Sequence, residues 1–449
     1  MLVDLLPGLC VVLLLCATLQ LSSLSRRWIN FNAEHCRKLI HFCMGMVALS
    51  FPWLFKSPIS VDILCAVSVS MLSLLKVMPD SCAWKTALCG TKRKTYGEIC
   101  FPIAVTILFS LTENNRLLYF IPLLILTTAD ALSALIGISY GRKQYHTADG
   151  CKTTEGSLVF LLVAFLAAHI PLLLLGDISR GQTLLVSLIV GLVAMLFEGI
   201  AWRGVDNLLI PIGAYFALCT HLNCDTNTLI CRLLALLAIL GASLFAKRFT
   251  TLNGSAILGV ALYLYFALIL GGIAWMAVPL IVFASYSRML PRRFRSMRSR
   301  HSIYPVLAIA SSGLLWLLCA GALSPERFII PYTLSFAINE AIVAIAHMPL
   351  KHLSKDRLRP ILIAVFKSWA LTFIPLFAII GFEHITLVEF LMMPVLILGP
   401  TLIFYASRKP REDLFVCRSI DNTRRWIEQT VIVTAGSSIG LIPFLGLVH

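Results

Sequence analysis

Long apolar runs recur along the whole chain and constrain its fold more than any other feature. The chain has 449 residues, of which 59% are hydrophobic. A run of about 18 or more apolar residues can cross a bilayer as a helix, whereas membrane-spanning strands alternate apolar and polar residues. The sequence therefore predicts an all-α fold, a polytopic transmembrane helical bundle of about 16 membrane segments. The expected segments lie near residues 3–24, 39–55, 59–79, 99–112, 117–139, 157–175, 184–202, 207–222, 229–246, 256–270, 273–287, 303–322, 328–347, 360–381, 387–406 and 427–448, with Gly271-Gly272 breaking the long run at 256–287.

The basic residues are placed in short loops between these runs. The formal net charge is +15, which in a soluble protein would suggest a nucleic-acid partner. Assigning the loops alternately to the two membrane sides puts the basic loops, from 26–38 to 408–425, on one side. This agrees with the positive-inside rule. We therefore expect membrane lipids and a nucleotide as partners, no nucleic acid, a cytoplasmic basic face and an N-terminus outside.

Acidic residues divide the chain into two halves. Before about residue 224 they recur at the expected cytoplasmic edge of the helices, whereas Glu340 is the main intramembrane carboxylate after it. We predict two membrane domains, 1–224 and 225–449, with the chemistry in the first.

The stretch 128–160 carries the densest set of chemical groups. Asp130 lies at the inner end of an apolar run, where an unpaired carboxylate is costly, so its expected partner is a metal ion or a lysine. Gly137 and Gly141 follow, and Lys152-Thr153-Thr154-Glu155-Gly156-Ser157 opens the next run. Carboxylates hold Mg²⁺, cations hold phosphate, and glycines let backbone N–H groups approach phosphate. The stretch therefore favours a site for Mg²⁺ and a polyphosphate.

Four further groups of charged residues lie at the same expected membrane face. Each could alone be an interfacial anchor, a loop or a helix cap, but together they favour one site. They are Arg37, Lys38 and His41; Lys94, Gly97 and Glu98; Glu198; and Asp206 with Asn207.

The order of these residues resembles the polyprenol kinase family, which includes phytol, farnesol and dolichol kinases and their CTP-using relatives. The resemblance covers roughly residues 25–220, and Lys152 to Ser157 after the Asp130 helix is its most specific part. Ala129 stands where glycine is usual and Thr153 where serine is common. The resemblance implies transfer of a phosphoryl group from CTP, or another NTP, to an isoprenoid alcohol such as phytol, farnesol or geranylgeraniol. It also implies Mg²⁺, and the basic loops place the expected active site at the cytoplasmic face.

The resemblance and the residue chemistry together assign candidate roles. Which carboxylate holds metal and which takes the alcohol proton is left open. The catalytic candidates are Asp130, Lys152 and Glu155; the metal candidates are Asp130, Glu155, Glu198 and Asp206; and the nucleotide or phosphate candidates are Arg37, Lys38, His41, Lys94, Gly97, Gly137, Gly141, Gly156, Ser157 and Asn207.

Other interpretations remain for each half. Asn253-Gly254 and Gly271-Gly272 weakly resemble the start of the phytyl-phosphate kinase family, but the acidic motif expected further on is missing, which favours a structural or degenerate second domain. The alternative enzyme is a CTP-dependent diacylglycerol kinase or a cytidylyltransferase-like protein, although the loop at 408–425 lacks a glycine-rich signature. A membrane transporter is the alternative of another class, and it would place polar residues near mid-membrane rather than at one face.

Overall fold

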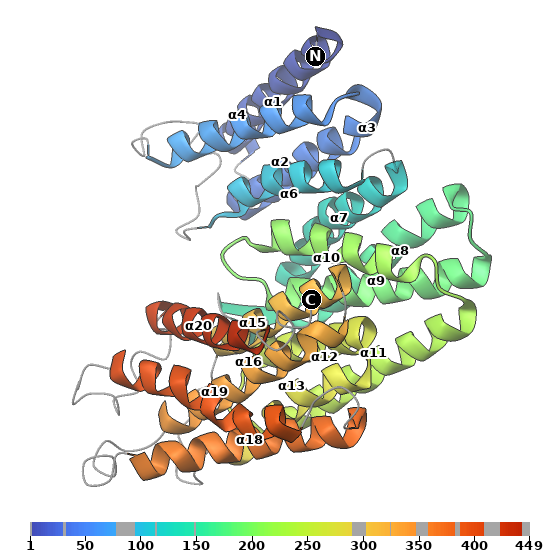
Figure 1. Ribbon diagram of the computed structural model, residues 1–449. Helices are drawn as coiled ribbons and strands as arrows, with labels where there is room; N and C mark the ends of the chain where they lie inside the picture. The colour runs from blue at the N-terminus through green and yellow to red at the C-terminus, as the bar shows by residue number, and fades with distance from the viewer. Residues whose placement is uncertain are drawn as a thin grey trace. The chain divides into compact units, whose positions relative to one another are not determined.

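Helices make up nearly all of the structure, a computed structural model (Figure 1). It describes residues 2–29, 33–77, 95–112, 115–147, 150–289, 302–323, 325–346, 358–381, 387–407 and 423–441. Each apolar run expected from the sequence overlaps a helix. Within the described residues, 10 helices are long and apolar enough to cross a membrane. The chain is therefore a multi-pass integral membrane protein, while the count of about 16 segments stays a prediction.

The chain separates into two compact units, Met1–Leu236 and Leu237–His449. The division falls within helix α11, a little after the boundary expected near residue 224. The functions expected of the two halves stay predictions.

The first unit is a bundle of helices with one short hairpin. Helix α7 packs against α2, α8 and α10, and α8 packs against α9. Its elements are α1 (Leu2–Ile29), α2 (Ala33–Leu49), α3 (Phe51–Leu54), α4 (Pro58–Val77), α6 (Gly97–Thr112), α7 (Arg116–Tyr140), β1 (Gln144–Thr147), β2 (Gly150–Thr153), α8 (Thr154–Leu175), α9 (Arg180–Ile200), α10 (Asp206–His221) and α11 (Thr226–Ala246).

Side-chain caps set where the helices of this unit begin. Asn115 accepts a hydrogen bond from the backbone N–H of Leu118 (3.2 Å) at the start of α7. Ser179 and Gln182 form a reciprocal capping box at the start of α9. Such caps satisfy backbone N–H groups that have no partner within the helix. The helices of the bundle therefore start at positions that the sequence itself marks.

A two-stranded hairpin joins α7 to α8, and the all-α prediction missed it. Strands β1 and β2 are antiparallel, with Tyr145 opposite Lys152. The Tyr145 hydroxyl lies 2.9 Å from Ser157 Oγ, which ties the hairpin to the first turn of α8. Strands of four residues are too short for an alternating pattern to be distinguished from a polar loop.

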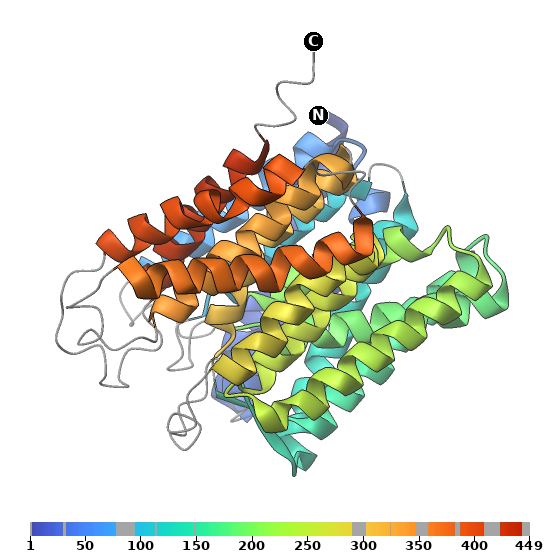
Figure 2. The same ribbon diagram turned by 60° about the horizontal axis from the view of Figure 1, so that its bottom comes forward.

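The second unit is built around helix α16, whose apolar span is almost entirely buried. It packs against α13, α15, α18, α19 and α20, and the helices run roughly alongside one another in both ribbon views (Figures 1 and 2). Gly272 has a φ of +82° and ends α12, so the break predicted at Gly271-Gly272 is confirmed. The elements are η1 (Lys247–Phe249), α12 (Gly254–Gly271), α13 (Ile273–Met289), α15 (Ile303–Ala322), α16 (Pro325–Ala346), α18 (Leu358–Ile380), α19 (Leu387–Ser407), α20 (Thr423–Ser438) and η2 (Ile439–Leu441).

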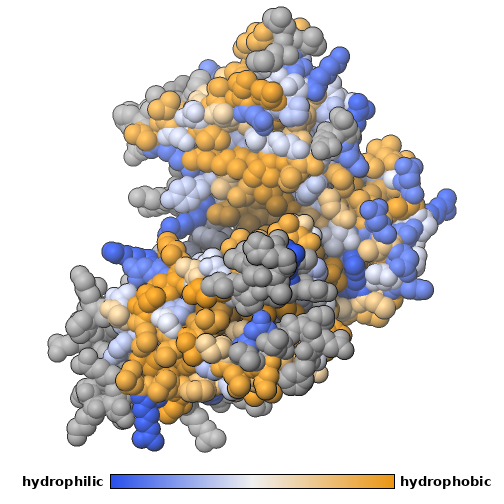
Figure 3. Space-filling view, viewed as in Figure 1, coloured by the Kyte–Doolittle hydropathy of each residue, from blue (hydrophilic) through white to orange (hydrophobic). Residues whose placement is uncertain are grey.

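Large apolar side chains gather on the face that Figure 3 shows. On α8, for example, Leu158, Leu162 and Leu174 are all exposed. In water such an extensive apolar surface would drive aggregation, whereas hydrocarbon solvates it. The surface therefore agrees with the membrane assignment made from the helices.

Candidate functional site

A buried ion pair joins α2 to α7 at the residue on which the sequence prediction centred. Lys38 Nζ lies 2.6 Å from Asp130 Oδ2, with side-chain exposures of 8% and 10%. His41 Nε2 lies 3.7 Å from the same oxygen, one helical turn along α2 from Lys38. A lysine was one of the two partners expected for Asp130, and the structure shows it. The pair also brings together three of the predicted site residues.

A second pair lies at the hairpin. Lys152 on β2 contacts Glu198 near the end of α9, with a Nζ–Oε1 distance of 2.7 Å, and it also donates to the backbone carbonyl of Glu198. Burial alone would lower the pKa of Lys152, but the carboxylates of Glu198 and Asp206 raise it above its ordinary value. The ammonium therefore stays charged at physiological pH.

The Glu198 carboxylate can accept a further hydrogen bond or cation beside this lysine. Its Oε2 atom is buried and has no hydrogen-bond partner among the residues that the structure describes. A buried carboxylate oxygen normally has a donor or a cation as partner. The position is therefore suited to a further positive group.

The start of α10 joins the site to the start of α6. Asn207 Nδ2 donates to the carbonyl of Gly97 (2.9 Å), and Asp206 Oδ1 accepts the N–H of Asn207 (3.0 Å). Gly204 has a φ of +84°, and a Cβ on it would lie 2.4 Å from the nitrogen of Gly97. Only glycine suits this position, because it needs both a left-handed backbone and a very close approach. This contact fixes Asp206 and Asn207 relative to α6.

In a third pair, Lys76 with Glu98, only Glu98 was singled out from the sequence. Lys76 Nζ lies 3.1 Å from Glu98 Oε2 and donates to the carbonyl of Thr95 (2.5 Å). Lys76 ends the apolar helix α4 and Glu98 begins α6. A cation in the last turn of one helix and a carboxylate in the first turn of another are both ordinary features. The sequence signal was present, but it did not separate the pair from routine helix ends.

An apolar cavity lies beside these pairs. His41, Glu98 and Asn207 form its polar part, and the His41 ring contacts Phe101 edge-on, with centroids 5.4 Å apart. His41 thus touches both the cavity and the Asp130 carboxylate. The lining residues are Ile40, His41, Met44, Leu72, Gly97, Glu98, Phe101 and Asn207.

Glu155, a predicted catalytic and metal residue, has backbone partners instead. Its carboxylate accepts the N–H groups of Arg142 (3.1 Å) and Lys143 (3.2 Å), and it therefore shapes the turn between α7 and β1. No group of three or more His, Cys, Asp or Glu side chains suited to a metal ion occurs within the described ranges. A metal role for Glu155 stays a prediction.

The predicted glycines are explained by close packing. A Cβ on Gly137 would lie 3.0 Å from Thr153 Oγ1, and one on Gly156 would lie 3.1 Å from the carbonyl of Ser133. A Cβ on Gly141 would lie even closer to Thr153, 2.4 Å from its Cγ2 atom. These positions let α7 approach the start of α8, where Thr153 caps the helix by accepting the N–H of Gly156. Phosphate binding by these glycines stays a prediction.

Two predicted phosphate ligands cannot be placed. Lys94 lies outside the described residues, and of Arg37 only its position in α2 is described, not its side chain. Ser157 is present at the site's edge through its contact with Tyr145.

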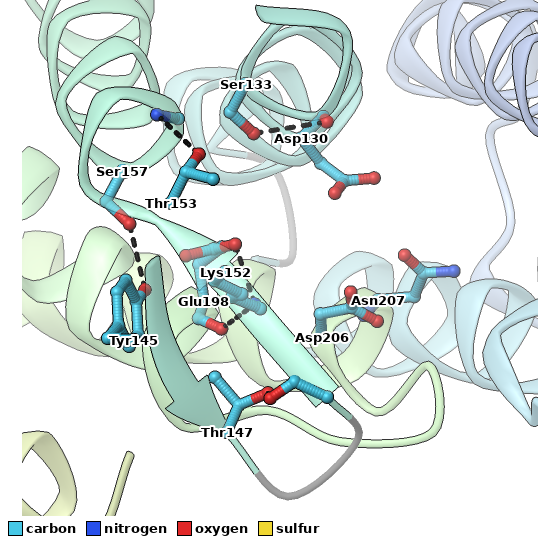
Figure 4. Close-up of polar contacts among 12 residues, drawn as sticks. Asp130, Ser133, Tyr145, Thr147, Lys152, Thr153, Ser157, Glu198, Asp206 and Asn207 are labelled. Carbon is cyan, nitrogen blue, oxygen red and sulfur yellow. Dashed lines mark hydrogen bonds and ion pairs between the residues drawn. The ribbon is translucent and has the colours of Figure 1, made fainter. Parts of the chain in front are cut away.

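The charged groups face a common region (Figure 4). The Asp130 carboxylate points toward the side on which Lys152, Glu198, Asp206 and Asn207 lie. Fold and site together define a multi-pass membrane protein with paired lysines and carboxylates beside an apolar cavity.

Comparison with known proteins adds one relative. The chain is 28% identical over 192 residues to phytol kinase from Synechocystis sp., a match that covers 40% of this chain and 77% of that protein. No protein-family model matches the chain, and no solved structure matches it. The similarity is distant and partial, and it supports the resemblance to polyprenol and phytol kinases found from the motifs.

Proposed function

We propose that this chain is a membrane lipid-alcohol kinase. It transfers a phosphoryl group from CTP, or another NTP, to an isoprenoid alcohol such as phytol, farnesol or geranylgeraniol at the cytoplasmic face. The observation that carries the proposal is that Lys38–Asp130, through His41, and Lys76–Glu98 adjoin an apolar cavity. Lys152–Glu198 lies near Asp206 and Asn207, the second of which also lines the cavity (Figure 4). The similarity to phytol kinase supports it.

The cavity is small and suits the hydroxyl-bearing end of an isoprenoid alcohol. Ile40, Met44, Leu72 and Phe101 offer an apolar wall for the chain. The hydroxyl would lie at the polar part, near His41, which stands between the cavity and Asp130. Asp130 then accepts the hydroxyl proton as the general base, and His41 orients the hydroxyl towards it.

The lysines suit the phosphates of the donor. Phosphoryl transfer requires positioning and neutralisation of charge more than covalent chemistry. Lys152 and Lys38 are both held by carboxylates, and Lys152 stays protonated because of them. When a nucleotide binds, each ammonium can turn part of its hydrogen bonding from carboxylate to phosphate without changing its charge.

The carboxylates at the hairpin fit Mg²⁺. The ion commonly uses one or two protein carboxylates together with substrate phosphates and water. Glu198, with its buried and unpartnered Oε2, and Asp206, which acts on the same lysine, would hold it. Bound there, Mg²⁺ would offset the negative charge of the nucleotide phosphates.

The test uses purified full-length protein, Mg²⁺ and CTP labelled at either the α- or the γ-phosphate, with farnesol, phytol, geranylgeraniol, dolichol and diacylglycerol as acceptors. We expect γ-label in an isoprenyl monophosphate. Transfer of α-label would indicate a cytidylyltransferase, and γ-label on diacylglycerol alone would indicate a diacylglycerol kinase. The kinase proposal would be refuted if no acceptor received a γ-phosphoryl group from CTP or from any other NTP tried in its place.

A further inference from the structure

The second unit contains a large cavity of its own. It is lined by the part of α11 that follows Leu236 and belongs to this unit, by α12, α13 and α18, and by the segment that follows η1. Its walls are mainly apolar, including Ile239, Leu264, Met276, Leu280, Ile281 and Leu371. Its polar lining consists of Ser243, Thr250, Ser285 and Lys367. A cavity of this composition suits an amphiphile with a long apolar tail and a small polar head.

Lys367 is the one charged side chain among the described residues that line this cavity. It lies nine residues into α18, about 14 Å along the helix axis. No carboxylate within the described ranges lies at ion-pair distance from its ammonium. Ionisable residues at membrane depth usually pair with an opposite charge or face a polar cavity. Glu340 lies close enough for Lys367 to act on it electrostatically, and an anion in this cavity would place a carboxylate in direct contact with the ammonium.

A buried carboxyl group lies directly behind the polar lining. Ser285 Oγ donates to Glu340 Oε1 (2.8 Å), and Glu340 is only 4% exposed. Its other oxygen, Oε2, has no hydrogen-bond partner in the described part of the chain. Any negative charge on Glu340 would therefore oppose further negative charge beside Ser285.

The polar groups lie towards one end of their helices. Ser285 is four residues before the end of α13, Glu340 is six before the end of α16, and Thr250 directly follows η1. With alternating crossings, these ends all belong to the side on which the basic loops are expected. A negatively charged head at this end would also be favoured by those loops.

We propose that this cavity binds a long-chain carboxylate, the anion of a fatty acid. Its carboxylate pairs with Lys367, while its tail lies along the apolar walls. One lysine compensates one negative charge, and Glu340 behind Ser285 opposes the second charge of a phosphate monoester. The proposal concerns the second unit alone and holds whether or not the first unit is a kinase.

The test is photolabelling of full-length protein in detergent with a diazirine analogue of palmitate, followed by mapping of labelled peptides. Competitors of equal chain length are palmitate, hexadecanol and hexadecyl phosphate. We expect saturable labelling of α12, α13 or α18, with palmitate competing about tenfold better than hexadecanol.

Matched variants test the role of charge. Lys367→Met should weaken palmitate competition about tenfold, whereas Lys367→Arg should keep it within about threefold. Arg359→Gln removes a charge from the same helix outside the cavity lining and should change nothing. Glu340→Gln keeps an acceptor for Ser285, removes the opposing charge and should improve competition by hexadecyl phosphate.

Several outcomes would overturn the proposal. They are the absence of saturable label from these helices, equal competition by hexadecanol, stronger competition by hexadecyl phosphate than by palmitate in the wild-type protein, and full binding by Lys367→Met. The double variant Lys38→Met with Asp130→Asn, which leaves no buried charge of this pair alone, is included as a variant of the first unit, and its labelling should match the wild type. Loss of kinase activity and loss of lipid binding are thereby measured separately.

Discussion

Removing the Asp130 charge should affect folding and chemistry in ways that a second substitution can separate. At 2.6 Å and an effective dielectric constant of about 20, the attraction between Lys38 and Asp130 is about 6 kcal/mol before desolvation is subtracted. Both side chains are at least nine-tenths buried, so water screens little of it. Asp130→Asn leaves the Lys38 ammonium buried without its counter-charge, which typically costs about 3–5 kcal/mol. As the proposed general base, Asp130 should also contribute about 10²–10⁴-fold to the rate.

The double variant Lys38→Met with Asp130→Asn removes both charges. It should recover most of the lost stability, because no buried charge is left alone, yet it should stay inactive. Thermal unfolding in detergent and γ-phosphoryl transfer to farnesol, measured on the wild type, both single variants and the double variant, give the comparison. If Asp130→Asn keeps wild-type stability, the pair does not hold α2 to α7. If it keeps activity within a few-fold, Asp130 is not the base.

Three further predictions concern metal, backbone and topology. Glu198→Gln should raise the Mg²⁺ concentration needed for half-maximal transfer by about tenfold, and an unchanged Mg²⁺ titration would exclude Glu198 as a ligand. Gly204→Ala should destabilise the protein by about 1–3 kcal/mol, because its φ is +84° and a Cβ would lie 2.4 Å from Gly97 nitrogen; an unchanged unfolding midpoint would contradict this. Cysteines introduced as Arg93→Cys and Arg295→Cys should both react from the cytoplasmic side of sealed vesicles. Labelling of the two from opposite faces would refute the expected crossing pattern.

The helix positions could be predicted because each helix is a run of apolar residues that can be read directly from the local sequence. Apolar runs mark the helices, and Gly271-Gly272 marks the break between α12 and α13. The need of Asp130 for a partner was also readable, because a charge at that depth is costly whatever surrounds it. That the partner is Lys38 depends on how α2 packs against α7, and nothing in either helix's own sequence specifies this.

The remaining site features depend on tertiary contacts, and the local sequence at these residues fits more than one structural role. Gly137 and Gly156 fit a phosphate-binding loop as well as a close helix crossing, and the structure uses them for the crossing. Glu155 fits a metal ligand as well as a backbone acceptor, and the structure gives it backbone N–H partners. The Lys76–Glu98 pair joins residues that lie far apart in the chain, at two ordinary helix ends.

The Lys38–Asp130 pair also has a consequence for biosynthesis. Its members lie 92 residues apart, so α2 is made long before α7. Until α7 arrives, the ammonium of Lys38 lacks its Asp130 partner, and the transfer of this charge into lipid costs free energy. Helix α2 should therefore stay near the translocation channel, or at the water interface, until α7 leaves the ribosome. A nascent chain that stops before α7 would expose a charged helix of the kind that membrane quality control degrades.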